Sequence, residues 1–180
     1  MAATTDRGVA GEGFTVETAE GLLPPGTRFE LHGGNILVMT PAAQWHTNVQ
    51  MGLVQMFRGR GLVAGMEVGI RIATKQTRVL DVGVFKGEPD LREAYFAPDQ
   101  IALAVEVVSP STAENDFRDK PILYAKLGIP EFWRITENED EDGDIVGYNV
   151  EVFVLGERGR YELARTASLD EIEAEGADAS

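Results

Sequence analysis

Apolar residues recur every three or four positions within Gln44–Phe57, which is the spacing of an amphipathic helix. The residues of this stripe are Trp45, Val49, Leu53 and Met56. A second helix is predicted over residues 117–127, because Pro121 is tolerated in a first helical turn and Gly128 provides a stop signal. A short helix is also expected near residues 17–22.

Extended segments are predicted around these helices. Two short runs on either side of Gly33-Gly34 predict a hairpin, and residues 66–73 and 78–85 predict two strands. The run Ile101–Val108 is apolar except for Glu106, as expected for a strand that is buried on both faces. The other segments are strands expected at residues 129–135, 148–155 and 160–164, a polar loop over 86–100 and an acidic loop over 137–147.

This order of elements predicts an α/β (α+β) fold, in which helices flank a mixed β-sheet. The length of 180 residues fits one domain, which we expect over residues 22–167. Residues 1–21 are interpreted as a flexible N-terminal segment and residues 168–180 as an acidic C-terminal tail.

Composition limits the chemistry that the chain can perform. There is no cysteine, so disulfides and thiolate metal sites are excluded and any metal must be bound by oxygen or imidazole. No signal peptide or membrane span is recognised, so the expected location is the cytoplasm and no membrane partner is expected. The net charge of −14 argues against a simple nucleic-acid-binding protein, because affinity for phosphate comes largely from Lys and Arg.

Two carboxylates stand in strands that are otherwise apolar. Glu106 interrupts the central run, and Asp81 lies within Val79–Val84. A lone buried charge is costly unless it is paired or bound to metal. Each acid alone is explained as well by a basic partner or by backbone amides as by a cation, whereas two acids in neighbouring strands would suit a hard divalent cation such as magnesium.

The segment from Ala104 to Thr112, followed by Asp116, Lys120 and Tyr124 and then by Gly128–Trp133, resembles the Uma-type family of putative restriction endonucleases. That family belongs to the PD-(D/E)XK nuclease superfamily. Upstream matches are Phe29-Glu30-Leu31 before a glycine-rich turn, Met39-Thr40-Pro41, His46 at a helix start, and Asp81 in a strand. The resemblance covers about residues 22–163 and implies a restriction-endonuclease-like arrangement of the sheet and helices.

The resemblance also implies roles for individual residues. Asp81 and Glu106 would bind the same Mg²⁺ or Mn²⁺ ion, with the carbonyl of Val107 as a further ligand. The superfamily lysine usually follows the second acid by two residues, where this chain has Val108. Lys120 from the following helix would replace it, although a surface position is the commoner fate of a lysine.

Four further residues are expected to support this site. Glu30 would bind a second metal ion or orient a water molecule. Asp116 would cap the helix or pair with Lys120. Tyr124 shares a helix face with Lys120, and either a hydrogen bond to the site or core packing explains it. His46 would touch the phosphate backbone or serve as a structural histidine.

The chain also has four arginines that either form a phosphate-binding patch or are scattered over the surface. They are Arg58, Arg60, Arg71 and Arg78.

The hypothesis is a metal-dependent endonuclease that hydrolyses DNA, with Asp81, Glu106 and Lys120 as its catalytic residues. A homodimer is expected, because cutting both strands needs two active sites. The alternatives are a catalytically idle binding or regulatory protein with a nuclease fold and a hydrolase of another phosphate ester. The negative charge of the chain favours the idle protein, whereas the intact acid pair and Lys120 disfavour it.

Overall fold

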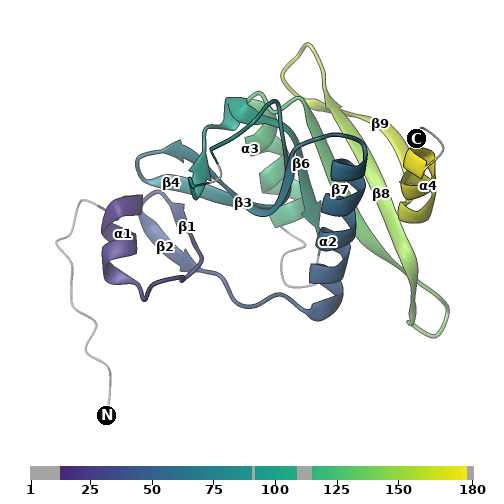
Figure 1. Ribbon diagram of the computed structural model, residues 1–180, viewed down its shortest axis with the longest axis horizontal. Helices are drawn as coiled ribbons and strands as arrows, with labels where there is room; N and C mark the ends of the chain where they lie inside the picture. Colours follow the sequence, from purple (N-terminus) through teal and green to yellow (C-terminus); the bar gives the residue numbers. More distant parts are fainter. Residues whose placement is uncertain (1–12, 91, 109–114, 178–180) are drawn as a thin grey trace.

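The structure is a computed structural model that describes residues 13–90, 92–108 and 115–177 (Figure 1). In chain order, its helices and strands are α1 (Val16–Leu22), β1 (Phe29–His32), β2 (Asn35–Val38), α2 (Gln44–Gly59), β3 (Ala64–Ala73), β4 (Gln76–Phe85), β5 (Tyr95–Phe96), η1 (Pro98–Gln100), β6 (Ile101–Val107), η2 (Asn115–Asp119), α3 (Lys120–Lys126), β7 (Glu131–Glu139), β8 (Ile145–Leu155), β9 (Tyr161–Ser168) and α4 (Leu169–Ala177).

The main sheet has seven strands in the order β5-β3-β4-β6-β7-β8-β9. β6 pairs with β7 in parallel, as β3 does with β5, and the other neighbours are antiparallel. The strand β6 that carries Glu106 therefore lies in the middle of the sheet. This mixed sheet with flanking helices confirms the predicted fold class.

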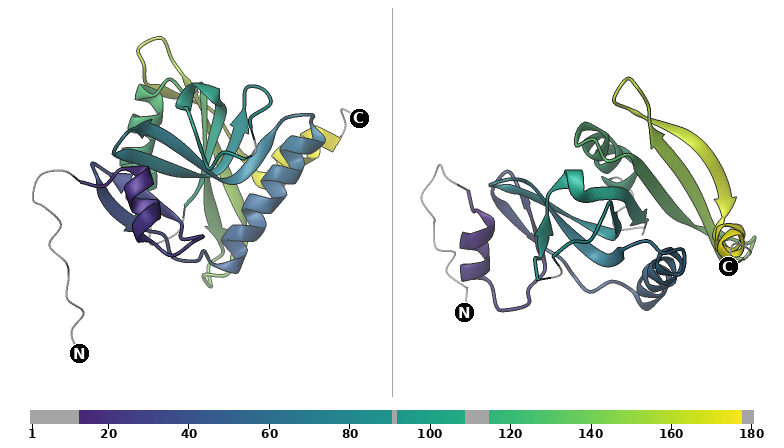
Figure 2. Two further views of the ribbon diagram at one scale, coloured as in Figure 1. Left: turned by 60° about the vertical axis from the view of Figure 1, so that its left-hand side comes forward. Right: turned by 45° about the horizontal axis from the view of Figure 1, so that its top comes forward.

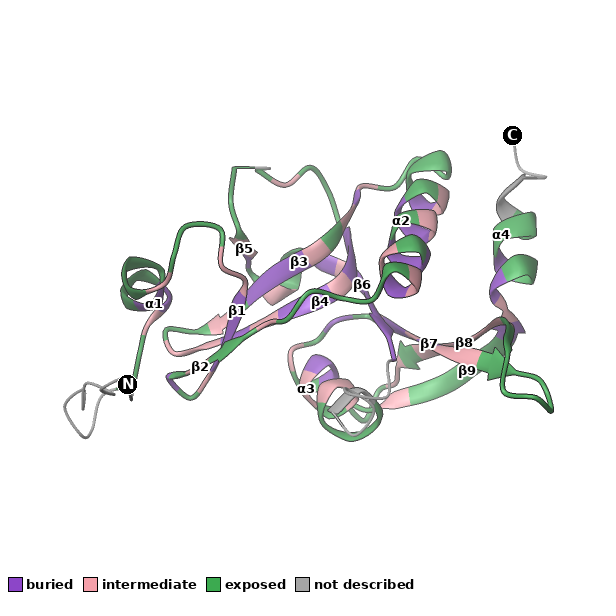
Figure 3. Ribbon diagram, turned by 90° about the horizontal axis from the view of Figure 1, so that it is seen from below, coloured by how far each residue is buried: buried purple, intermediate pink, exposed green. Residues whose placement is uncertain are grey.

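Helices cover both faces of the sheet and create two apolar cores (Figure 3). On one face, α2 and α4 pack against side chains that include Val82, Val105 and Ile135. On the other face, Tyr124 of α3 packs against side chains that include Ala104 and Phe132. Both faces of β6 are buried, which explains its almost continuous apolar sequence.

The hairpin β1–β2 forms a separate two-stranded sheet at the end of the molecule away from β8 and β9 (Figure 2). Its attachment to β4 is polar. The backbone N–H of Leu31 donates to Thr77 Oγ1 at 2.9 Å, and Arg78 Nη1 donates to the carbonyl of Leu31 at 3.1 Å. These bonds fix β1 beside β4, and with it the carboxylate of Glu30.

The expectation of an acidic loop over residues 137–147 is wrong. β7 continues to Glu139 and β8 begins at Ile145, so only a short turn separates them. Backbone pairing extends along this ribbon, and Glu137 lies opposite Tyr148. The charged residues are tolerated because they are half-buried or exposed there, where a charge keeps its contact with water. Similarly, the loop expected over 86–100 contains the two-residue strand β5 and the single turn η1.

Packed helices lie at both ends of the described chain, beyond the limits of 22 and 167 that the sequence suggested. In α1, Val16 and Ala19 are buried against the β1–β2 hairpin. In α4, Leu169 and Ile172 are buried in the core that α2 also covers. Residues 1–12 and 178–180 lie outside the described residues. In the described part of the chain, every helix is too short or too polar to cross a membrane.

Candidate active site

Asp81 lies where the regular alternation of β4 breaks. Leu80 contributes to the core beneath α3, whereas Val82 contributes to the core beneath α2. On the neighbouring strand, Glu67 stands between the partners of these two residues and has a left-handed backbone with a φ of 52°. Such a conformation is strained for a residue with a side chain. Glu67 and Asp81 do not form a pair within the otherwise continuous register around them, and the change of face in β4 occurs at this position.

Neutral donors hold the Asp81 carboxylate. Gln50 Nε2 of α2 donates to Oδ1 at 3.0 Å, and the backbone N–H of Val107 donates to Oδ2 at 2.7 Å. His46 Nε2 lies 3.3 Å from Oδ2 and 3.0 Å from the carbonyl oxygen of Val107. Because both of these neighbours are acceptors, Nε2 must carry the proton in this arrangement.

Glu106 is fully buried and contacts the opposite helix. Lys120 Nζ lies 2.5 Å from Oε2, and the hydroxyl of Tyr124 donates to Oε1 at 2.6 Å. Burial of the phenol and, second, the adjacent Glu106 charge raise the pKa of Tyr124 well above its ordinary value. Tyr124 therefore remains a protonated donor over the physiological pH range.

The local sequence explains why Lys120 and Tyr124 meet Glu106. Lys120 is the first residue of α3, and Pro121 occupies an early helical position where the missing N–H costs nothing. Tyr124 follows one turn later on the same face. Gly128 then ends the helix with a φ of 73°, which allows the chain to turn back into β7.

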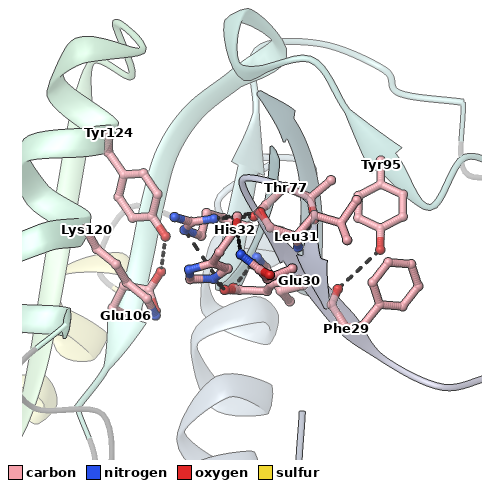
Figure 4. Close-up of polar contacts among 12 residues, drawn as sticks. Phe29, Glu30, Leu31, His32, Thr77, Tyr95, Glu106, Lys120 and Tyr124 are labelled. Atoms are coloured by element: carbon pink, nitrogen blue, oxygen red, sulfur yellow. Dashed lines mark hydrogen bonds and ion pairs between the residues drawn. The ribbon is translucent and has the colours of Figure 1, made fainter. Parts of the chain in front are cut away.

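Glu30 lies close to this group, on β1 (Figure 4). It is 6% exposed, and it accepts the backbone N–H of Val79 at 2.8 Å and contacts His32 Nε2 at 2.7 Å. Figure 4 shows Glu106, Lys120 and Tyr124 turned toward one another beside the pair of Glu30 and His32. A cavity of about 280 Å³ joins the two groups, and its lining consists of Glu30, His32, Arg78, Asp119, Lys120 and Leu123.

The donors around Asp81 are of the kind that magnesium takes. Asp81, Glu106 and the Val107 carbonyl offer only oxygen, the ligand atom that hard divalent cations prefer. Asp81 Oδ2 and the Val107 oxygen both contact His46 Nε2, at 3.3 and 3.0 Å, so this nitrogen occupies the point that the two oxygens share. Among the described residues, no three acidic or histidine side chains form a ready metal cluster. The donor set thus fits magnesium in the kind of its ligand atoms.

Gln50 is a site residue that the sequence reading missed. It is 2% exposed and is held by its bond to Asp81. The buried stripe of α2 is in fact His46, Val49, Gln50, Leu53, Val54 and Phe57. Two polar residues one turn apart within an otherwise apolar stripe were the available signal of a role for Gln50.

The backbone of Asp116 belongs to η2, but its side chain lies outside the described residues, as do residues 109–114.

The four arginines do not form one patch. Arg58 donates to the carbonyl of Ala64, Arg60 to the carbonyl of Ile172, and Arg71 to the carboxylate of Glu17. Arg78 alone among them lines the cavity beside Lys120.

A mixed sheet flanked by helices is the arrangement of the restriction-endonuclease-like nucleases. The model of the Uma2 family, described as "Putative restriction endonuclease", matches residues 16–177. The chain belongs to this family.

The comparison with solved structures gives the same fold. The chain resembles the structure titled as a putative nuclease belonging to DUF820 from Anabaena variabilis ATCC 29413, with a TM-score of 0.60 and 17% sequence identity. The match covers 87% of this chain and 84% of the other. A search among curated proteins found no match.

Proposed function

We propose that this protein is a metal-dependent endonuclease that hydrolyses phosphodiester bonds in DNA. The main support is the buried Glu106, in direct contact with Lys120, in a chain of the Uma2 family. Asp81 lies on the adjacent strand, and its carboxylate accepts the N–H of Val107, the residue next to Glu106. The proposal is thus supported by two acids on adjacent central strands, one of which contacts Lys120.

Asp81, Glu106 and the carbonyl of Val107 would hold the ion, which is Mg²⁺ or Mn²⁺. The bound ion would supply Lewis-acid activation of the phosphate and a water of lowered pKa. The Val107 N–H and Gln50 orient the Asp81 carboxylate. Lys120 presents an ammonium that stabilises the negative charge developing on the phosphate, and Tyr124 holds the second oxygen of Glu106.

The negative charge of the chain does not oppose this proposal at the site itself. Of the two acids, Glu106 is already paired with Lys120, and a divalent ion would offset Asp81. Acidic residues are concentrated instead on remote segments such as Glu137–Asp144. Local neutralisation allows a phosphate to approach despite the overall charge of −14.

Cleavage of supercoiled plasmid DNA with Mg²⁺ tests the proposal. We expect Asp81→Asn and Glu106→Gln to reduce cleavage to background, because each removes a charged ligand. Asp142→Asn in the exposed β7–β8 turn is the matched control and should cut like the wild type. Equal cleavage by all four proteins would refute the site. An RNA of the same length, tested in parallel, determines whether the substrate is DNA.

A homodimer is proposed as the form that cuts both strands, because each chain provides one site. Sedimentation of the protein with a short duplex should show two chains per duplex, and linear plasmid should appear without accumulation of nicked circles. A monomer that only nicks would contradict the dimer and leave the proposed chemistry intact.

A catalytically idle protein is the second candidate, and one observation favours it. Both oxygens of Glu106 already have protein donors, so a structural role satisfies this carboxylate without any metal. Titration calorimetry with Mg²⁺ and Mn²⁺ separates the two candidates. Binding that Asp81→Asn abolishes supports the nuclease; no binding, or binding that this variant leaves unchanged, supports the idle protein.

A further inference from the structure

We propose that the cavity beside Lys120 binds a backbone phosphate of the nucleic acid, adjacent to the one that is cleaved, and that Arg78 is its main contact. This inference rests on the proposed nuclease function and adds a substrate-positioning site to it. The cavity holds about 280 Å³ and opens between β1, β4 and the start of α3.

Arg78 is positioned in advance for this role. Its Nη1 donates to the carbonyls of Leu31 and Thr77 at 3.1 and 2.6 Å, and its Nε lies 4.0 Å from Glu30 Oε2. Its side chain is only 14% exposed, so the guanidinium loses little further freedom on binding. Among the described residues, the hydrogen bonds of the guanidinium come from Nη1, which leaves Nη2 as the donor for a ligand.

Two basic side chains of the cavity can donate to a phosphodiester. Lys120, which also pairs with Glu106, and Arg78 both line it, in a chain with 16 basic and 30 acidic residues. Glu30 balances one of them but is itself occupied by the Val79 N–H and His32. Asp119 remains as the exposed acid of the lining, where it opposes an anion.

The position of the cavity relative to Lys120 determines which phosphate it would hold. Lys120 belongs both to the cavity lining and to the pair with Glu106, so the cavity adjoins the proposed reaction centre without containing Asp81. A strand whose scissile phosphate reaches Lys120 would place a neighbouring phosphate against Arg78. The contact recognises the backbone and carries no base specificity.

The test is the affinity for a duplex oligonucleotide in EDTA, measured by fluorescence anisotropy over a range of NaCl concentrations. Arg78→Gln should weaken binding about tenfold at low salt. It should also reduce the slope of log K against log [salt] by about 0.9, as loss of one phosphate contact requires. Arg71→Gln, which removes an exposed arginine paired with Glu17, is the matched control and should keep the slope.

Asp119→Asn tests the same cavity in the opposite direction. It removes a negative charge from the lining and should tighten binding roughly two- to threefold at low salt, an effect that damage to the fold would not produce. Asp142→Asn is its control for a general change of charge. Titration with sodium phosphate against sodium chloride at equal ionic strength distinguishes a site for free phosphate, which would show saturable competition.

The outcomes separate this inference from the proposed function. If the wild type cuts DNA but Arg78→Gln has the slope of Arg71→Gln and Asp119→Asn matches Asp142→Asn, the phosphate site is wrong and the nuclease stands. Competition by free phosphate that Arg78→Gln leaves unchanged would also overturn the proposed contact. A wild type that neither binds nor cuts nucleic acid overturns both proposals.

Discussion

Asp81 and Glu106 occupy neighbouring strands, yet the protein holds the two acids in different ways. Neutral donors from α2 and the β6 backbone surround Asp81, whose side chain is 18% exposed. The cation of Lys120 and the phenol of Tyr124 hold Glu106, which is fully buried. Each acid is thus attached to a helix on a different face of the sheet.

The different partners determine how readily each acid could bind a cation. The Gln50 side chain and the Val107 N–H orient Asp81 without adding a positive charge, whereas Lys120 pairs directly with Glu106, so Asp81 is the better prepared of the two to attract a cation. Glu106 already has a compensating charge, so its partner Lys120 serves both the stability of the fold and the proposed chemistry. Substitutions around the two acids should therefore have effects of different kinds.

Lys120→Met should have the largest effect on stability. It removes the cationic partner of a fully buried carboxylate, and breaking such a pair costs about 3 kcal/mol of the free energy of unfolding. Asp81→Asn should cost only about 1 kcal/mol, because its donors are neutral. Urea denaturation measures both values.

The double variant Glu106→Gln/Lys120→Met serves as the control for this difference. It removes both charges and should be more stable than Lys120→Met alone. If Lys120→Met is no less stable than Asp81→Asn, the ion pair between Lys120 and Glu106 does not contribute to the stability of the fold. The contrast between the two acids then disappears.

Gln50→Leu should have an intermediate effect, on activity rather than stability. Leucine keeps most of the volume but removes the donor to Asp81 Oδ1, and loss of such a supporting bond typically costs 10- to 100-fold in metal affinity or activity. Cleavage rates measured over a range of Mg²⁺ concentrations should show a higher metal requirement. Gln55→Leu, on an exposed part of the same helix, is the control, and an equal response from both variants would exclude Gln50 as a positioning residue.

Tyr124→Phe should have the smallest effect at neutral pH, about 1 kcal/mol for one lost hydrogen bond. The raised pKa of Tyr124 gives this variant a distinct pH dependence. Below pH 10 the phenol is protonated in both the folded and the unfolded chain, and its contribution is complete. Above pH 10 only the unfolded chain ionises, so the wild type loses stability as the pH rises.

The wild type and Tyr124→Phe should therefore converge in stability between neutral pH and about pH 11. Tyr148→Phe provides the comparison, because Tyr148 is only half-buried and its pKa is raised by partial burial and, less, by Glu137. A constant difference between the wild type and Tyr124→Phe across this range would show that Tyr124 ionises freely in the folded protein.

Most of the fold could be predicted from the sequence, because the period of apolar residues reports directly which faces are buried. The α2 stripe and the run of β6 are the clearest cases. The outer part of the β7–β8 ribbon, residues 136–139 and 145–147, could not be predicted, because it pairs through the backbone and its polar side chains carry no alternation. The burial of α1 and α4 depends on distant partners, which local pattern does not encode.

The candidate site was less accessible to sequence reasoning. Asp81 and Glu106 stood out because a charge in a buried strand demands a partner. The identity of the partners did not follow from their spacing in the sequence, since Lys120 emerged from family resemblance and Gln50 went unnoticed. The strained Glu67 opposite Asp81 leaves no trace in a pattern of polar and apolar residues.

The order of strands in the sheet has a consequence for how the chain folds. β7, β8 and β9 are neighbours in both the chain and the sheet. Their pairing closes only short loops, which costs little entropy, and the same holds for the β3–β4 hairpin. The parallel pairing of β6 with β7 requires the crossover through α3 first. We expect the three strands β7–β9 and the β3–β4 hairpin to form early, and β6, which carries Glu106, to join them late. The site would then assemble in the slowest step of folding.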